Sequence, residues 1–266
     1  MTQTNGLAAS YFERLGPHGF KPTHHASGAW RSDEQHFSPL GGLLVHAIER
    51  ARAAEQRPEL VLGRISFDIL GKIDLDEFEI QVETLRPGRT IELVEATAVI
   101  GQRPAVRARA WFLAGQDTSA VAGGADEPLP DADAAQRAAE TAVWSGGYID
   151  SLDWRNVGTP APGRSTTWIS TSVGLVEGEP VSTLASYIAL VDTANGLSPR
   201  QDPREWMFPN VDLTIHLHRQ PEGRWAGLDT SVVFGSDGQG ITSTTLHDVR
   251  GPIGRAEQIL TVRPLP

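Results

Sequence analysis

The sequence predicts an α+β protein in which one structural plan is used twice. Each half of the chain contains a helical segment followed by four strand-like segments in succession. Turn residues are placed alike in the two halves. Pro87-Gly88 in the first half corresponds to Asp237-Gly238 in the second, and Gly101 corresponds to Gly251 at the same separation. Element order and turn positions are independent observations, and both indicate a duplication.

In the first half, a strand is expected over residues 28–32 and a helix over residues 39–51. Apolar residues at helical spacing give the helix one apolar face. They are Leu40, Leu43, Leu44, Ala47, Ile48 and Ala51. The strands that follow are expected over residues 62–70, 77–85, 90–100 and 105–113.

The second half repeats this order. A strand is expected over residues 165–173, a helix near residues 181–195, and strands over residues 211–218, 225–234, 241–248 and 255–262. A single helix next to four consecutive strands buries its apolar face best if the antiparallel sheet wraps around it. This is the hotdog architecture. Two copies in one chain are expected to join their sheets into one continuous layer with few open edges.

The two copies are separated by a segment without apolar periodicity. Residues 115–142 are rich in small side chains and carry six acidic residues against one arginine. We interpret this segment as an acidic linker that contributes little burial, with an N-terminal hotdog over residues 1–114 and a C-terminal hotdog over residues 143–266.

Composition excludes several classes of function. A net charge of -10 argues against a partner with a phosphate backbone, so no nucleic acid is expected. The absence of cysteine removes disulfides, thiolate nucleophiles and zinc ribbons. No secretory signal or apolar run of membrane-spanning length is recognisable, so a cytoplasmic protein without a membrane partner is expected.

A carboxylate lies on the buried face of the second predicted helix. The spacing of three and four places Asp192 on one stripe with Leu184, Ile188 and Val191. A buried carboxylate needs hydrogen-bond partners or a raised pKa, and both are typical of a working acid or base. The alternative is an aspartate that bonds local backbone near a helix C-terminus.

Two amides are further candidates. Gln258 is the polar member of the inward row of the last strand, and Ala108 occupies the same position in the first copy. Because alanine satisfies the packing at this position, the presence of an amide needs another explanation. It has either a function or a buried backbone group as its hydrogen-bond partner. Strand alternation places Asn210 on the face opposite to the apolar row, which is the wrong side for a site next to the helix. However, Asn210 directly follows Pro209 at the start of the strand, where pairing need not yet fix the register.

Other chemistries lack their motifs. There is no Gly-x-Ser-x-Gly nucleophile elbow and no Walker-type loop, and residues 235–240 are best explained as a hairpin turn. His216 and His218 stand on one strand face, but no third ligand follows at a suitable spacing. We therefore expect neither a metal nor a cofactor.

Several motifs occur in the same order and spacing as in a known family. They are FSPLGG at 37–42, TLRPGRT at 84–90, FPNVDLTIHLHR at 208–219, GQG at 238–240 and GRAEQIL at 254–260. With these motifs the chain resembles the TesB-like (type II) acyl-CoA thioesterases, which are double-hotdog enzymes, in a variety that looks typical of actinobacteria.

The resemblance implies a set of site residues. The family has an aspartate on the second helix, a small polar residue at the start of the next strand and a glutamine on the last strand. These positions fall on Asp192, Asn210 and Gln258. Asn210 replaces the threonine of the best-known members, which leaves Thr214 as the reserve candidate.

The implied reaction is hydrolysis of fatty acyl-CoA by water. Asp192 would act as general base on a water held by the two amides, and N–H groups at Gly41 and Gly42 would bind the substrate carbonyl oxygen. Acyl-CoA is the expected partner, and a homodimer or higher homo-oligomer is possible.

Two alternatives stay open at this point. One is a non-catalytic hotdog protein that binds acyl-CoA or lipid. The other is an enzyme like the enoyl-CoA hydratases, which would need a D-x-N-P-x-H pattern. After Asp192 the sequence continues Thr-Ala-Asn-Gly-Leu and departs from that pattern.

Overall fold

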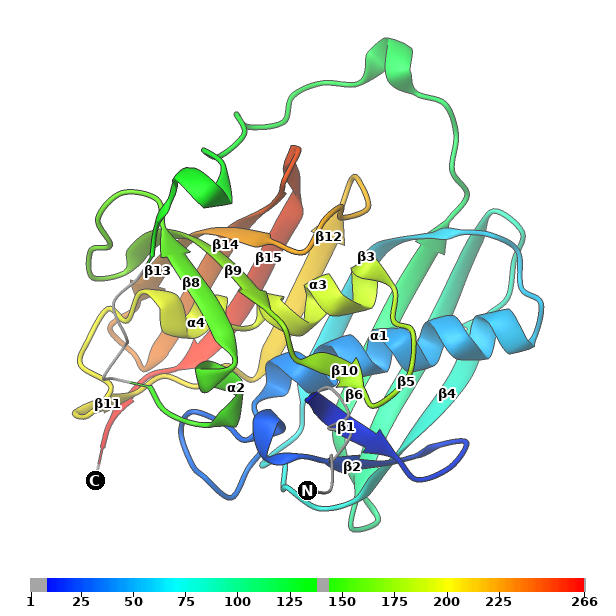
Figure 1. The fold of residues 1–266 in the computed structure, drawn as a ribbon, viewed down its shortest axis with the longest axis horizontal. Coiled ribbons are helices and arrows are strands. Elements are labelled where there is room, and N and C mark those ends of the chain that lie inside the picture. The colour runs from blue at the N-terminus through cyan, green and yellow to red at the C-terminus, as the bar shows by residue number, and fades with distance from the viewer. Residues whose placement is uncertain (1–8, 138–143, 266) are drawn as a thin grey trace, which may run out of the picture.

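A 14-stranded sheet runs through both halves of the chain in the computed structural model, which describes residues 9–137 and 144–265 (Figure 1). The first half supplies β1 (Ser10–Arg14), β2 (Gly19–Pro22), β3 (Val61–Ile69), β4 (Phe78–Arg86), β5 (Ile91–Ile100) and β6 (Arg103–Leu113). The predicted linker supplies β7 (Gln136–Arg137). The second half supplies β8 (Leu152–Asn156), β9 (Arg164–Thr171), β10 (Gly174–Val176), β12 (Asp212–Leu217), β13 (Ala226–Phe234), β14 (Gln239–Asp248) and β15 (Gly251–Thr261). A separate pair joins β11 (Trp206–Met207) to β16 (Arg263–Pro264).

The two halves meet at the antiparallel pair of β3 and β12. Ile65 lies opposite Ile215 in this pair, and Phe67 lies opposite Leu213. The strand order from one edge to the other is β10-β1-β2-β4-β5-β6-β3-β12-β15-β14-β13-β9-β8-β7. This arrangement confirms the predicted double hotdog with one continuous sheet. The four strands after each helix also lie where the sequence places them.

The expected strand over residues 28–32 is wrong. This segment is a loop that folds back on itself, because the N–H of Gly28 donates to the carbonyl oxygen of Glu34 at 2.7 Å. The strands that precede the helix are instead β1 and β2. They are followed by the short 3-10 helix η1 (His24–Ala26).

The helices lie side by side against one face of the sheet (Figure 1). In the first half α1 spans Phe37–Ala54, two residues earlier than predicted at its start. The expected second helix is divided into α3 (Thr183–Val191) and α4 (Ala194–Leu197), and a short helix α2 (Gly147–Asp150) precedes them. None of the helices in the described ranges is long and apolar enough to cross a membrane.

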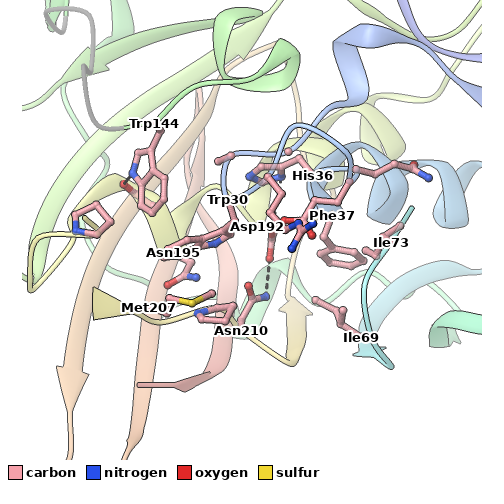
Figure 2. Close-up of a pocket in the computed structure, with 18 of the residues that line it drawn as sticks. Trp30, His36, Phe37, Ile69, Ile73, Trp144, Asp192, Asn195, Met207 and Asn210 are labelled. Atoms are coloured by element: carbon pink, nitrogen blue, oxygen red, sulfur yellow. Dashed lines mark hydrogen bonds and ion pairs between the residues drawn. The ribbon is translucent and has the colours of Figure 1, made fainter. Parts of the chain in front are cut away.

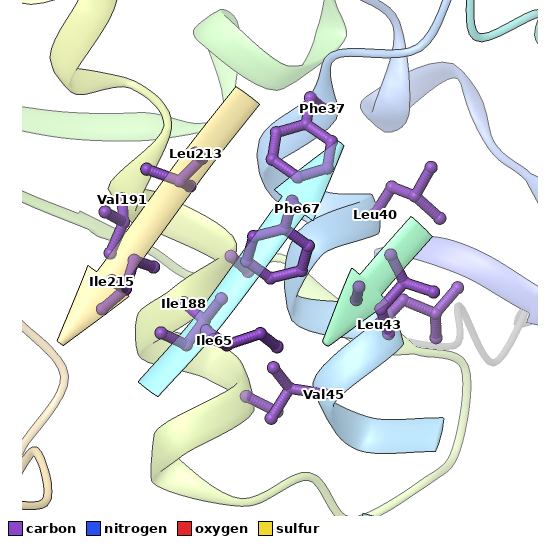
Figure 3. Packing of buried hydrophobic residues seen from close by; sticks show 14 of the residues in the cluster. Phe37, Leu40, Leu43, Val45, Ile65, Phe67, Ile188, Val191, Leu213 and Ile215 are labelled. Atoms are coloured by element: carbon purple, nitrogen blue, oxygen red, sulfur yellow. The ribbon is translucent and has the colours of Figure 1, made fainter. Parts of the chain in front are cut away.

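The core lies between these helices and the sheet (Figure 3). Leu40 and Leu43 of α1, Ile188 of α3 and Phe67 of β3 are almost completely buried. The two long helices approach closely at Gly42. A Cβ atom there would lie 2.6 Å from the Cβ of Ala189 and 2.6 Å from the carbonyl oxygen of Ala185. Gly42 therefore allows the helices of the two hotdogs to pack together.

One edge of the sheet is shared between the halves. β10 comes from the second half, yet it pairs in parallel with β1, with Ser10 opposite Gly174 and Phe12 opposite Val176. Beyond the strand, Glu179 binds Arg14 of β1, and its Oε2 lies 3.1 Å from Nε2 of His46 on α1. The second half thus completes the sheet of the first.

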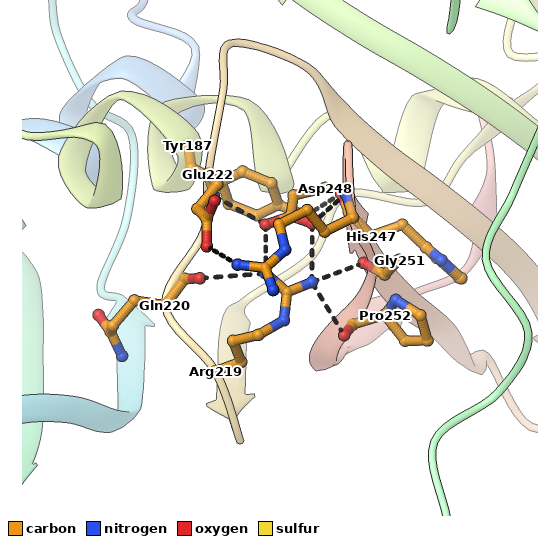
Figure 4. A network of polar contacts seen from close by, with 9 residues as sticks. Tyr187, Arg219, Gln220, Glu222, His247, Asp248, Gly251 and Pro252 are labelled. Atoms are coloured by element: carbon orange, nitrogen blue, oxygen red, sulfur yellow. Dashed lines mark hydrogen bonds and ion pairs between the residues drawn. The ribbon is translucent and has the colours of Figure 1, made fainter. Parts of the chain in front are cut away.

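A buried carboxylate joins the strand ends of the second half (Figure 4). The guanidinium of Arg219 donates to both oxygens of Asp248, at 2.6 and 2.7 Å, and the N–H groups of Glu222 and Arg250 donate to the same carboxylate. The hydroxyl of Tyr187 on α3 donates to the adjacent carbonyl oxygen of His247 at 2.9 Å. This network fixes α3 to the sheet.

The described part of the predicted linker packs more than expected. After the exposed turn η2 (Ser119–Val121), the chain returns to the C-terminal sheet at η3 (Ala132–Ala134). There the indole of Trp168 donates to the carbonyl oxygen of Pro130 at 2.8 Å, and Ala132 is buried. Residues 138–142 of the segment lie outside the described residues, and the domain boundaries stay predictions.

Candidate active site

A cavity of about 800 Å³ opens where the two halves of the chain meet (Figure 2). Asp192 and Asn210 lie near its centre. Apolar side chains line it on both sides, with Phe37, Ile69 and Ile73 on one side and aromatic residues that include Trp30 and Trp144 on the other. A large apolar cavity with a few convergent polar groups is the usual form of a ligand site.

Asp192 lies at the break between α3 and α4, where it is the C-cap of α3. Only 5% of the residue is exposed. Its Oδ1 accepts hydrogen bonds from Nδ2 of Asn210 at 2.7 Å and from Nε2 of Gln258 at 2.8 Å. Oδ2 has no hydrogen-bond partner among the described residues. The structure therefore brings together the three side chains that the sequence had singled out.

Burial changes the acid–base properties of this carboxylate. Removal from water raises the pKa of Asp192 to about 6, and the hydrogen bonds from Asn210 and Gln258 oppose that rise by favouring the ionised form. A carboxylate with this pKa is ionised at neutral pH. It is also more basic than an aspartate in water, so it suits the role of a general base.

Asn210 reaches the site through a break in strand alternation. Thr214 of β12 pairs with Glu257, but Asn210 pairs with Leu260, so one extra residue lies on this side of the ladder. The carboxylate of Asp212 fills the gap by accepting from the N–H of Ile259 at 2.7 Å. Such a bulge reverses the inward and outward faces. Asn210 consequently points to Asp192.

Gln258 points inward from β15 and is 2% exposed. Its counterpart Ala108 is fully buried in the apolar core of the first half. The Gln258 amide has the Asp192 side chain as its short hydrogen-bond partner, and the carbonyl oxygen of Asp192 lies farther away at 3.4 Å. The difference between the two copies therefore coincides with the presence of the carboxylate.

Gln258→Ala should reduce kcat by about 10- to 100-fold, because one of the two donors that hold Oδ1 is lost. The fold should be retained, since the first copy already has alanine at this position. Steady-state kinetics and thermal unfolding test this, with the exposed Gln239→Ala on the neighbouring strand as control. Unfolding of Gln258→Ala alone would show that the amide is structural.

The other expected site residues lie elsewhere. Thr214 is on the outer face of β12, between Ser66 and Glu257, and does not line the cavity. Gly41 and Gly42 also lie outside the cavity lining. Because α1 begins at Phe37, their N–H groups lie beyond the first turn, where they bond within the helix. Their expected role as carbonyl-binding donors is not supported by this geometry.

The sequence argument missed His36, which lines the cavity next to Asp192. Its Nδ1 lies 3.8 Å from Oδ2 of Asp192 and accepts the N–H of Ser38 at 3.1 Å as the N-cap of α1. Burial lowers the pKa of His36 to about 3, so the ring is neutral and the contact is not an ion pair. The signal that could have found it is the start of α1, which the apolar spacing placed two residues too late.

Comparison with known proteins shows which family the chain matches. Two family models match the chain: the acyl-CoA thioesterase N-terminal domain matches residues 26–113, and the acyl-CoA thioesterase C-terminal domain matches residues 124–262. No curated protein gave a sequence match.

Many solved structures share the fold. A tesB protein from Mycobacterium avium subs paratuberculosis is 16% identical with a TM-score of 0.69, covering 95% of this chain and 96% of its own. An acyl-CoA thioesterase II from Mycobacterium marinum is 14% identical with a TM-score of 0.64, covering 96% and 95%. A conserved protein of unknown function with a hot dog fold from Alicyclobacillus acidocaldarius is 13% identical with a TM-score of 0.72, covering 97% of each chain.

Proposed function

The chain belongs to the acyl-CoA thioesterase family and is a thioester hydrolase, and we propose that it cleaves fatty acyl-CoA with a water activated by Asp192. The observation that carries this proposal is the arrangement around one buried carboxylate. Both amides donate to Oδ1, while Oδ2 has no partner among the described residues and adjoins the cavity. Oδ1 is held in place by the two amides, and Oδ2 is available to accept a proton from water.

The proposed reaction needs no covalent intermediate. Oδ2 of Asp192 takes a proton from the water while the water oxygen attacks the thioester carbonyl carbon. The tetrahedral intermediate then collapses and the carbon–sulfur bond breaks. CoA leaves as a thiolate, which receives the proton that Asp192 had taken from the water. The fixed carboxylate supplies the orientation that makes such an attack efficient.

The walls of the cavity support an acyl substrate. On both sides of Asp192 the lining is apolar, from Phe37, Ile69 and Ile73 across to Trp30 and Trp144 (Figure 2). An acyl chain that leaves water for such walls gains about 0.8 kcal/mol per methylene. Binding should therefore strengthen with chain length until the cavity is filled.

The direct test is release of free thiol from a series of straight-chain acyl-CoA esters, followed with a thiol reagent. Thiol release that depends on Asp192 supports the proposal. Binding without release would favour the acyl-binding module. With an enoyl-CoA ester as substrate, loss of enoyl absorbance without thiol release would favour a hydratase. A cytoplasmic location and a homo-oligomer remain predictions.

The rate should follow the ionisation of Asp192. Because the base must be deprotonated, kcat/KM should fall about tenfold per pH unit below the pKa of about 6 and be level above it. A pH profile from 4.5 to about 8.5, buffered at constant ionic strength, measures this. A profile that is flat through pH 6 would contradict the assignment of Asp192 as base.

A further inference from the structure

The ring of His36 is held in one orientation within the cavity wall (Figure 2). Its Nδ1 accepts the N–H of Ser38 at 3.1 Å, and its face packs on the ring of Tyr148 with the centroids 4.3 Å apart. The hydroxyl of Tyr148 is in turn fixed by the hydroxyl of Thr193 at 2.7 Å. The imidazole is therefore tied to the residue that follows Asp192.

These contacts determine the tautomer of His36. Nδ1 cannot carry a proton while it accepts the Ser38 N–H, so the proton of the neutral ring is on Nε2. Among the described residues, Nε2 has no hydrogen-bond partner. The atom is also not completely buried, so a ligand can reach it. A hydrogen-bond donor without a partner thus lies at the cavity, near the carboxylate.

The ring stays neutral throughout the working range of pH. Burial lowers the pKa of His36 to about 3, and its place at the N-terminus of the 18-residue helix α1 also disfavours a positive charge. A neutral imidazole in such a place can donate a hydrogen bond to a carbonyl oxygen without exchanging its proton.

Backbone donors at this helix start are mostly unavailable. The N–H of His36 bonds the carbonyl oxygen of Ala26 at 2.8 Å, that of Ser38 bonds the imidazole, and Pro39 has none. This leaves the N–H of Phe37 as the remaining backbone donor of the first turn. A substrate carbonyl next to Asp192 can therefore accept from this N–H and from the imidazole of His36, since both residues line the cavity.

We propose that Nε2–H of His36 donates a hydrogen bond to the thioester carbonyl oxygen and to the oxyanion that forms from it. This inference rests on the proposed function. It makes the site composite, because the base comes from the second half and the oxyanion donor from the first. The proton stays on Nε2 throughout, so the donor stabilises charge and transfers nothing.

Two substitutions separate this role from helix capping. His36→Asn keeps an oxygen near the position of Nδ1 for the Ser38 N–H but loses the Nε2 donor. His36→Gln keeps an N–H near the position of Nε2 but loses the cap. We expect kcat of His36→Asn to fall about 100-fold with nearly unchanged KM and Tm. His36→Gln should lower Tm yet keep kcat within about tenfold of the natural protein.

The opposite result, full kcat in His36→Asn with loss only in His36→Gln, would overturn the inference and leave His36 as a cap. A spectroscopic readout adds an independent arm. In the Asp192→Asn background, the infrared carbonyl stretch of bound acyl-CoA should shift to lower frequency only when His36 is present. Absence of thiol release in the natural protein would instead count against the proposed function.

Discussion

Replacement of Asp192 by asparagine should lower kcat for thioester hydrolysis by about 100-fold or more and should also stabilise the folded protein above pH 6. The loss of rate follows because an amide cannot take a proton from water. The fold should tolerate the change well. An asparagine oxygen can still accept from Asn210 and Gln258, and its NH₂ would take the place of Oδ2 beside the cavity.

The gain in stability follows from the raised pKa. In the folded state the pKa of Asp192 is about 6, whereas an unfolded aspartate titrates near 4, so the folded protein binds this proton more tightly. The stability that the protonated group contributes is complete below about pH 4 and is lost as pH rises through about 6, about 3 kcal/mol in all. Asparagine removes that loss.

Urea unfolding at pH 5 and at pH 8, together with thiol release, measures both effects. The exposed Asp237→Asn in a hairpin turn is the matched control and should change neither the rate nor the pH dependence. Turnover near the natural level in Asp192→Asn would place the catalytic base elsewhere. An unchanged free energy of unfolding at pH 8 would mean that ionised Asp192 is not destabilising.

The second large effect concerns the contact between the two hotdogs. Gly42→Ala should destabilise the protein by about 1–3 kcal/mol, because the new methyl group would lie 2.6 Å from both Ala189 and the backbone of Ala185. The adjacent Gly41→Ala is its control. There the methyl group meets only the Phe37 ring, at 3.3 Å, and alanine gains about 1 kcal/mol in helix propensity.

Thermal and urea unfolding of the two variants give the comparison directly. We expect Gly42→Ala to unfold at lower temperature and Gly41→Ala to unfold at or above the temperature of the natural protein. Similar behaviour of both would mean that the helices can move apart at little cost. It would also weaken the view that Gly42 is needed for packing.

The sequence predicts the duplicated plan well because the plan rests on local periodicity. The inward row of β15 is largely apolar and the apolar stripe of α1 has one clear face, so the pattern identifies both elements without knowledge of the partner elements. Asp192 and Gln258 could be found for the same reason. Each is a polar residue in a row that is otherwise apolar.

What the sequence could not predict depends on contacts between distant segments. The bulge before β12 turns Asn210 inward through a bond between Asp212 and the backbone of Ile259, which no alternation pattern contains. His36 is the N-cap of α1, and its place beside Asp192 depends on the packing of the first half against the second. The close approach at Gly42 likewise depends on the partner helix, so the sequence alone does not distinguish a packing glycine from a binding one.

The pairing of β10 with β1 has a consequence for synthesis of the protein. The first half is complete at Leu113, but the strand that covers its edge ends at Val176, about 60 residues later. At a translation rate of about 5–20 residues per second, the nascent N-terminal hotdog waits for about 3 to 12 seconds with β1 paired to β2 on one side and open on the other. During that interval an open strand edge can pair with another chain, so the ribosome-bound intermediate is exposed to aggregation.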